Sequence, residues 1–390
     1  MKINSLSLVA FATLSMSTVL SANTLSEALT NGKVSGEVAA TYEKRSFNKD
    51  NGSYYRDSEY SVGSFALKYE TGVWNNMSLT SKFRIYGTIF EDNSSAETGT
   101  GTGDASGRFY EKNGSNKTVD IEELFITYAL ENVSVKAGRQ AISTDWINKT
   151  HDAVKVDASF GDTSIEAIWS LRDGRVYSRD YRPVEKINDK DGVYKLALTQ
   201  KFNENISATA YGLVMPDMKD IYGAKTNLTF GDTSLRLHYA ISEEDAVSRD
   251  DSNIIDLMIN TSIEGFTPYI GYVKIDSDTA FPGYSNSDSS DSGETIVPFE
   301  EGDYVYSKDA QTIYLGIGKS FGDLSTSLLY GTTKYDAGAQ MQRVHETSLW
   351  LGYPVIKDLQ ASLGYTIVDE DKDSTVSDYD QVNFTLAYSF

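Results

Sequence analysis

Hydrophobic and polar residues alternate with a period of two along most of the chain. Segment 381–390 places apolar side chains at Val382, Phe384 and Leu386 and at the two aromatic residues that follow, with small polar residues between them. A period of two is the side-chain period of a β-strand. An apolar face that ends in aromatic rings, opposite a small polar face, is typical of a strand with lipid on one side and water on the other.

Eighteen segments carry this alternation, and we expect each of them to form a strand. They are 33–44, 60–71, 77–90, 118–131, 133–140, 153–160, 163–172, 193–202, 206–215, 219–230, 233–242, 253–263, 266–276, 309–320, 324–333, 343–353, 359–369 and 379–390. Because 206–215 and 266–276 are ambiguous in phase, sixteen strands are the alternative.

The connections between these segments fall into two classes by length. Several are very short, and three of them are near-identical turns, Phe160-Gly161-Asp162-Thr163, Phe230-Gly231-Asp232-Thr233 and Phe321-Gly322-Asp323-Leu324. Glycine supplies the positive φ that a tight hairpin turn needs. Other connections are long and polar, at 45–59, 91–117, 173–192 and 277–308. Short turns at one rim and long loops at the other predict an all-β fold, a transmembrane antiparallel β-barrel of about eighteen strands with short periplasmic turns and long extracellular loops.

A soluble β-sandwich is the competing fold, because its strands alternate as well, with their apolar faces packed inward. Mean hydropathy is −0.37 and does not separate the two, since only every second residue of a barrel strand meets lipid. The N-terminus favours the barrel. Lys2 precedes an apolar stretch, 6–20, and the small residue Ala22, which together predict a secretory signal peptide over 1–22. The stretch is shorter than the ~20 residues that span a bilayer. The barrel domain is then 23–390.

Composition argues against an enzyme. Cysteine is absent and the chain has three histidines, without a Gly-x-Ser-x-Gly or His-Glu-x-x-His motif. The net charge of −21 is unfavourable for a nucleic-acid partner. We expect no catalytic residue, no resident metal and no cofactor. The acidic loop residues Asp288, Asp291 and Glu294 could bind Ca²⁺, although a solvated loop is the favoured interpretation because no Asp-x-Asp-x-Asp-Gly pattern is present.

Charged residues within the strands indicate which side faces water. A charge on the lipid face at mid-depth costs ~2–4 kcal/mol, so strand phase predicts that these side chains point into the lumen. In 77–90, for example, Phe83 and Ile85 face lipid, which turns Lys82 and Arg84 inward. The residues predicted to line the pore are Glu37, Lys68, Lys82, Arg84, Glu123, Lys155, Asp157, Glu166, Arg172, Lys195, Arg236, Asp256 and Glu346.

The pore constriction is expected after the fifth strand. Segment 141–152 is the candidate for a loop that folds into the lumen, where Asp145, Lys149, His151 and Asp152 would present both signs of charge. Arg139 has the parity of the lipid-facing Val135. It can join the charged residues in the lumen only if the chain bulges near Gly138 or the strand ends there. An ordinary exposed loop is the alternative.

Three stretches resemble a known family. The final strand, with Tyr388 and Phe390, looks like the signal that the barrel-assembly machinery reads in outer-membrane proteins. The start, Leu-Ser-Glu-Ala-Leu-Thr-Asn-Gly-Lys-Val-Ser-Gly-Glu at 25–37, resembles that of Opr-family porins, the major outer membrane porins of Campylobacter-type bacteria. Val-Lys-Ala-Gly-Arg-Gln at 135–140 resembles the porin segment before the inward-folding third loop. The resemblance implies eighteen strands, a homotrimer and passage of small hydrophilic solutes.

The sequence therefore predicts a bacterial outer-membrane porin for passive diffusion of small solutes and ions, weakly selective for cations because its mouth is acidic. A channel selective for small charged solutes such as carboxylates is a second hypothesis, with Lys82, Arg84 and Arg236 among the guiding residues. A barrel that serves mainly as an adhesin or receptor is a third. Expected partners are the barrel-assembly machinery, lipopolysaccharide and outer-membrane lipid, and further copies of the chain.

Overall fold

The computed structural model describes residues 22–48, 57–93, 103–109, 118–189, 191–245, 250–282, 295–301, 303–371 and 378–390. Its elements are α1 (Leu25–Thr30), β1 (Lys33–Phe47), β2 (Ser58–Glu70), β3 (Met77–Glu91), η1 (Asp104–Gly107), β4 (Thr118–Ala129), β5 (Val133–Ser143), β6 (Asn148–Phe160), β7 (Thr163–Val176), β8 (Tyr181–Lys186), β9 (Val193–Asn203), β10 (Ile206–Met215), β11 (Lys219–Phe230), β12 (Thr233–Glu244), β13 (Ser252–Thr261), β14 (Phe266–Ile275), η2 (Asp303–Tyr306), β15 (Gln311–Phe321), β16 (Leu324–Asp336), β17 (Met341–Ile356), β18 (Leu359–Glu370) and β19 (Tyr379–Ser389). No helix in the described ranges is long and apolar enough to cross a membrane.

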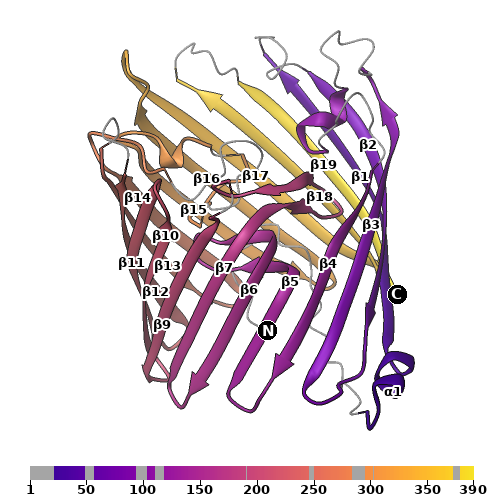
Figure 1. The fold of residues 1–390 in the computed structure, drawn as a ribbon. Helices are drawn as coiled ribbons and strands as arrows, with labels where there is room; N and C mark the ends of the chain where they lie inside the picture. Colours follow the sequence, from indigo (N-terminus) through magenta and orange to yellow (C-terminus); the bar gives the residue numbers. More distant parts are fainter. Residues whose placement is uncertain are drawn as a thin grey trace.

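The strands form one closed antiparallel barrel (Figure 1). Apart from β8, each strand pairs with the strands before and after it, and β1 closes the ring by pairing with β19 from Glu37↔Ser389 to Phe47↔Tyr379. Of the 19 strands of the sheet, β8 pairs with β7 alone, and β7 also pairs directly with β9. Eighteen strands therefore make the wall, which confirms the predicted number and excludes sixteen.

The observed strands coincide with the eighteen predicted segments, with ends that shift by a few residues. The additional strand, β8, lies in a stretch that we expected to be loop. Its sequence, Tyr-Arg-Pro-Val-Glu-Lys, lacks a regular alternation and contains Pro183, which suits an edge strand because proline cannot donate a hydrogen bond. The three predicted Gly-Asp turns are present, with Gly161, Gly231 and Gly322 each at a φ of 60°.

The two faces of the wall differ as the alternation predicts. Large apolar side chains such as Ile270, Leu315 and Phe160 are exposed on the outer face. The inner face carries polar residues and two buried hydrophobic clusters, one around Trp146 and Leu213 and a smaller one around the aromatic rings of β2 and β3. These clusters are unusual for a water-facing surface, and they mark the places where chain segments fold into the barrel and cover the wall.

Candidate functional site

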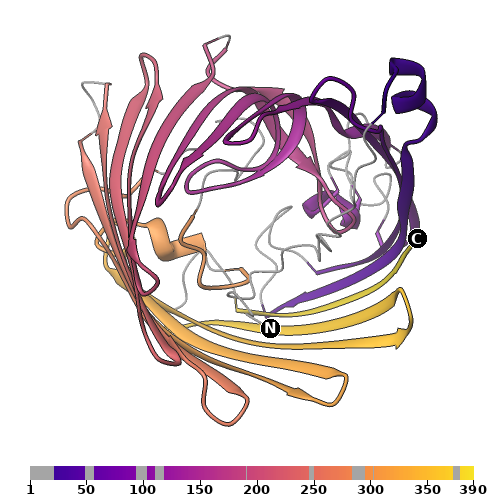
Figure 2. The same cartoon turned by 90° about the horizontal axis from the view of Figure 1, so that it is seen from below.

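Segments that connect the strands at one rim enter the barrel and narrow it (Figure 2). The short helices η1 and η2 both lie inside the ring of strands in this view. Beyond Ser170, β7 leaves β9 and forms a hairpin with β8, whose Tyr181 packs on Tyr86 of β3 with ring centroids 5.1 Å apart. The tip of the β5–β6 hairpin also turns inward. The lumen is therefore lined by these segments as well as by the wall.

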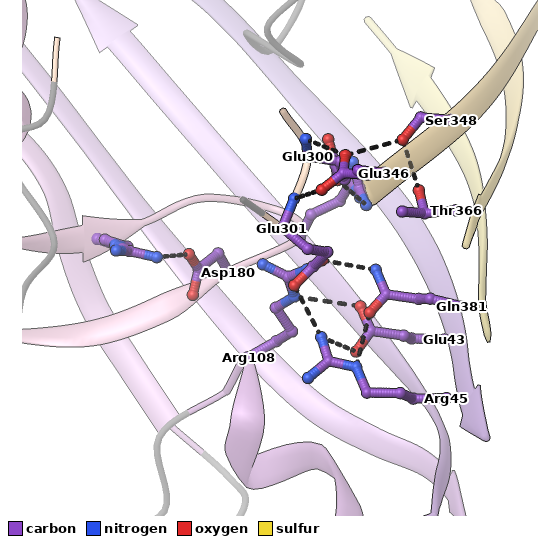
Figure 3. Close-up of polar contacts among 12 residues, drawn as sticks. Glu43, Arg45, Arg108, Asp180, Glu300, Glu301, Glu346, Ser348, Thr366 and Gln381 are labelled. Atoms are coloured by element: carbon purple, nitrogen blue, oxygen red, sulfur yellow. Dashed lines mark hydrogen bonds and ion pairs between the residues drawn. The ribbon is translucent and has the colours of Figure 1, made fainter. Parts of the chain in front are cut away.

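Two arginines and two glutamates form a connected set of ion pairs in this constriction (Figure 3). We call Glu43, Arg45, Arg108 and Glu301 the arginine–glutamate cluster. Arg45 donates from Nη2 to Glu301 Oε2 at 3.0 Å, and Arg108 donates from Nε to Glu43 Oε2 at 3.1 Å. Arg108 also pairs with Glu301. Glu43 and Arg45 belong to the wall strand β1, whereas Arg108 and Glu301 belong to infolded segments, so the cluster ties both segments to the wall.

A single carboxyl group on β17 fixes the backbone of the second infolded segment. Glu346 accepts hydrogen bonds from the amide nitrogens of Glu300 and Glu301, at 2.7 and 3.1 Å, and from Ser348 Oγ at 3.0 Å. Its side chain is nearly fully buried. Because the carboxyl oxygens have three donors, Glu346 holds the position from which Glu301 reaches the arginines.

In the infolded segment, the adjacent residues Glu300 and Glu301 have pKa values shifted in opposite directions. Burial raises the pKa of Glu300 to about 7, since its nearest cation, Arg179, is 3.8 Å away and Glu301 adds a negative charge beside it. The pKa of Glu301 is lowered, because Arg108 and Arg45 outweigh the effect of burial. Burial alone would lower the pKa of Arg108, but Glu301 and Glu43 raise it well above its usual value. Glu301 and Arg108 are thus ionised, and Glu300 titrates near neutrality.

The inward tip of the β5–β6 hairpin packs against the wall strands β9 to β12. The indole nitrogen of Trp146 donates to Tyr211 Oη at 2.7 Å, and the same oxygen lies 2.6 Å from His238 Nε2. Lys195 of β9 donates to Thr144 Oγ1 at 2.9 Å. Asp145 pairs with Lys225 of β11, and this cation lowers the pKa of the Asp145 carboxyl against the effect of burial. The tip is therefore anchored to this part of the wall by hydrogen bonds and an ion pair.

On the wall, predicted inward charges of β2 to β4 form a second network. Arg84 donates to Glu122 Oε2 at 2.9 Å and to Glu37 Oε1 at 2.8 Å, and Lys82 donates to Glu122 Oε1 at 2.6 Å. Lys68 lies 3.5 Å from Glu123. A register shift in the β3–β4 pairing lets Glu122 and Glu123 both reach inward cations, although they are adjacent in sequence.

The inward charges of β6 to β13 are paired in the same way. Lys195 lies 2.9 Å from Glu166, and Lys155 lies 3.1 Å from the other oxygen of that carboxylate and also pairs with Asp157. Farther round, Arg236 lies 2.7 Å from Asp256. Strand phase thus placed these residues and those of β2 to β4 on the inner face. Whether each one governs permeation stays a prediction.

Four residues are not placed as the sequence predicted for the constriction or the pore wall: Lys149, His151, Arg139 and Arg172. Segment 141–152 is not an infolded loop, because residues up to Ser143 and from Asn148 are paired strand and the turn between them is the inward part. His151 is fully buried and bonds to Ser170 Oγ and to the carbonyl of Asn148, so it presents no charge to the pore. Lys149 lies within β6 opposite Ile142 with a φ of 84°.

Arg139 does not turn inward through a bulge. The pairing of β5 with β6 keeps its register past Gly138, so Arg139 retains the parity of Val135. It lies where β4 and β5 separate, and it bridges Asp152 at 2.7 Å and Asp120 at 3.0 Å. Asp120 belongs to β4 and Asp152 to β6, so Arg139 of β5 links the two strands on either side of it.

Arg172 was predicted to line the pore by strand phase, but the register places it on the other face of its strand. The β6–β7 pairing shifts register after Ser170, which reverses the phase and turns Asp173 rather than Arg172 to the buried side. Arg172 is exposed on the opposite face of the strand. The proposed calcium-binding residues Asp288, Asp291 and Glu294 lie outside the described residues, as does nearly all of the predicted signal peptide.

Sequence reasoning missed most of the arginine–glutamate cluster. Arg108 and Glu301 lie in polar connections, where no periodicity indicates a direction. Glu43 and Arg45 do carry a signal, since both share the inward parity of Glu37 on the same strand. That parity could have nominated them as lumen residues, but not their partners.

Comparison with known proteins identifies the family. A family model for the Campylobacter major outer membrane protein matches residues 1–214. The chain belongs to this family. No curated protein matches it by sequence. The structure is similar to that of the outer membrane protein opdK from Pseudomonas aeruginosa, with a TM-score of 0.74 and 14% identity over 92% of this chain and 98% of that chain. OccAB2 from Acinetobacter baumannii gives a TM-score of 0.74 and 16% identity over 93% and 99%. At these identities the likeness shows the fold alone.

Membership of the Campylobacter major outer membrane protein family places the chain in the outer membrane as a porin, and the family and the barrel together indicate a channel rather than an enzyme. The rim with the Gly-Asp turns then faces the periplasm, and the rim from which the infolded segments enter faces the outside. The resemblance noted at 25–37 and 135–140 is confirmed at the level of the family.

Proposed function

We propose that this porin passes small hydrophilic solutes and ions by passive diffusion, with a weak preference for cations. The observation that carries the proposal is the pairing of the inward cations. Arg84 lies against two carboxylates, Arg108 against two more, and Lys195 against Glu166. The side chains of Arg84 and Lys195 are only 3% and 2% exposed. Such cations offer little attraction to a passing anion, because their charge is already neutralised and partly removed from water.

A loosely paired carboxylate at the constriction supports the cation preference. The arginine–glutamate cluster balances two positive charges with two negative ones. Glu300 lies beside it and adds a further carboxylate, only weakly opposed by Arg179 at 3.8 Å. A negative group in a narrow lumen with low-dielectric walls raises the local concentration of cations.

Selective passage of small carboxylates is the second candidate, and a specific feature favours it. Lys136 and Lys155 are directly opposite on β5 and β6, as are Lys68 and Lys82 on β2 and β3. Like charges placed opposite each other destabilise a sheet, and Lys136 forms no ion pair among the described residues, so an anion beside it would relieve the repulsion from Lys155. One related structure, OpdK from Pseudomonas aeruginosa, is described with vanillate, which is a property of that protein.

Reconstitution of the purified protein in planar lipid bilayers separates the candidates. We expect ohmic single-channel steps and a reversal potential in a KCl gradient that has the sign of cation preference. Glu300→Gln should reduce that potential at neutral pH, whereas Asp358→Asn, in the periplasmic turn after β17, should leave it unchanged. Saturable block by a carboxylate, lost in Lys136→Gln, would support the selective channel instead. Absence of any conductance from folded protein would refute both.

A further inference from the structure

A row of cations crosses the outer face of the barrel on β14 to β17. Lys274 is opposite Gln311, Gln311 is opposite Lys334, and Lys334 is opposite Arg343. The row thus runs across four adjacent strands, and each member lies near the end of its strand at the rim that faces the outside. With neighbouring strands ~4.8 Å apart, the three cations lie within ~15 Å of one another.

These side chains point away from the lumen. Lys334 and Arg343 are exposed, while their neighbours Thr333, Tyr335 and Val344 are buried. The Arg343 side chain is 47% exposed. The row therefore faces the surroundings of the barrel and takes no part in the pore.

The position of Lys334 opposite Arg343 is unfavourable without a partner. Like charges directly opposite on neighbouring strands destabilise a sheet. Among the described residues, Lys334 has no carboxylate within ion-pair distance, whereas Lys274 and Lys308 pair with Asp309 and Asp336. Asp371 is 3.9 Å from Arg343 but bonds to His345 at 2.9 Å. Within the described part of the chain, Lys334 therefore lacks a carboxylate partner, and Arg343 has only Asp371 at the limit of ion-pair distance.

The surface beside the row is graded in polarity toward the middle of the membrane. Two residues farther along the strands toward the middle of the membrane, the outer face carries Ile313, Thr332 and His345, which are paired across the strands. The next step brings Leu315 and Tyr330, and the Tyr330 ring stacks on His345 with centroids 6.3 Å apart. Aromatic and then aliphatic residues are typical of the descent from the membrane interface into the hydrocarbon. This surface therefore suits an amphiphile whose anionic head contacts the cations and whose acyl chains lie on the apolar residues nearer the middle of the membrane.

We propose that Lys334 and Arg343 bind a phosphate group of lipopolysaccharide in the outer leaflet. The rim is the outward-facing one, so the amphiphile comes from the leaflet that lipopolysaccharide occupies in a bacterial outer membrane. Phosphate can accept charge-assisted hydrogen bonds from the guanidinium and the ammonium together, which turns the unfavourable pair into a favourable site. Because the whole chain carries a net charge of −21, this pair of cations is a local exception on the lipid-facing surface and directs an anionic ligand to this place.

Binding of rough lipopolysaccharide to the folded full-length protein in detergent tests the site. Lys334→Gln combined with Arg343→Gln should weaken binding by about tenfold, as expected for the loss of two charge-assisted hydrogen bonds. Lys357→Gln is the matched control, since Lys357 is 92% exposed in a turn at the periplasmic rim. The same lipopolysaccharide after enzymatic removal of its phosphates should bind wild type and double variant equally weakly.

A charge reversal separates ligand binding from a role in folding. Lys334→Glu creates an opposite-charge pair with Arg343, so it should raise the temperature at which the barrel unfolds while it reduces lipopolysaccharide binding. Equal binding by wild type and the double variant would overturn the proposal. So would phosphatidylglycerol that competes as well as lipopolysaccharide, because the site would then serve any anionic lipid.

Discussion

Gly36 and Phe390 exchange two backbone hydrogen bonds across the seam between β1 and β19, with N–O distances of 2.8 and 3.0 Å. The Phe390 ring also occupies the space next to Gly36, where an added Cβ would lie 2.3 Å from its Cζ atom and 2.6 Å from the carbonyl oxygen of Ala66. Glycine is required at this position because the aromatic ring and the neighbouring strand leave no space for a side chain.

Gly36→Val should therefore impair closure of the barrel. We expect a loss of stability of about 1–3 kcal/mol from overpacking, with a lower yield of the folded form that migrates differently when heated. Gly87→Ala is the control, since an added Cβ there meets nothing within 4 Å. The interpretation fails if the two variants fold in equal yield. Phe390→Ala should also reduce assembly in cells, as expected if the barrel-assembly machinery reads the final strand.

Glu346→Ala should release the segment that carries Glu300 and Glu301. Removal of a group that accepts three hydrogen bonds should weaken the docking of that segment by about 3 kcal/mol. Single-channel recordings should then show larger and noisier conductance steps. Asp358→Asn is a suitable control, because asparagine also tolerates its positive φ of 65°. Conductance identical to that of wild type would show that the segment is held by other contacts.

Cation preference should depend on pH through Glu300. Its raised pKa of about 7 means that the group is a carboxylate above neutral pH and gains a proton as the pH falls through that value. The reversal potential in a salt gradient should therefore move toward anions with a midpoint near 7, and this step should be absent in Glu300→Gln. A step that persists in the variant would assign the titration to another group.

Arg139→Ala should disturb the β5–β6 hairpin, whereas Arg172→Ala should not. Arg139 bridges Asp120 and Asp152, and its removal leaves two carboxylates facing each other where β4 and β5 part. The expected cost is about 1 kcal/mol, with altered conductance or selectivity of the channel. Arg172 is an exposed arginine nearby and serves as the control. Equal behaviour of the two variants in bilayer recordings would remove any special role for Arg139.

Strand phase predicted the wall well and the constriction poorly, for a physical reason. A charge such as Lys82 or Asp256 has one acceptable direction, because lipid covers the other face of its strand. That rule needs an unbroken register, and it failed at Arg172, where one extra residue in β7 reverses the phase. It says nothing about Arg108 or Glu301, which lie in connections and find their partners through the three-dimensional path of the chain. The sequence predicted that Asp145 lies in an inward segment. It did not predict that the residues on both sides of this tip are paired strand, because the segment carries polar residues typical of a loop.

The arginine–glutamate cluster and Glu346 anchor the narrowing segments to wall strands by contacts confined to a few residues. Aperture and surface display are therefore encoded in separate parts of the sequence. The described connection between β16 and β17, residues 337–340, provides none of the ion-pair partners of Glu301 or Arg108, so substitutions there should change what an antibody or a bacteriophage meets at the cell surface while the aperture keeps its size.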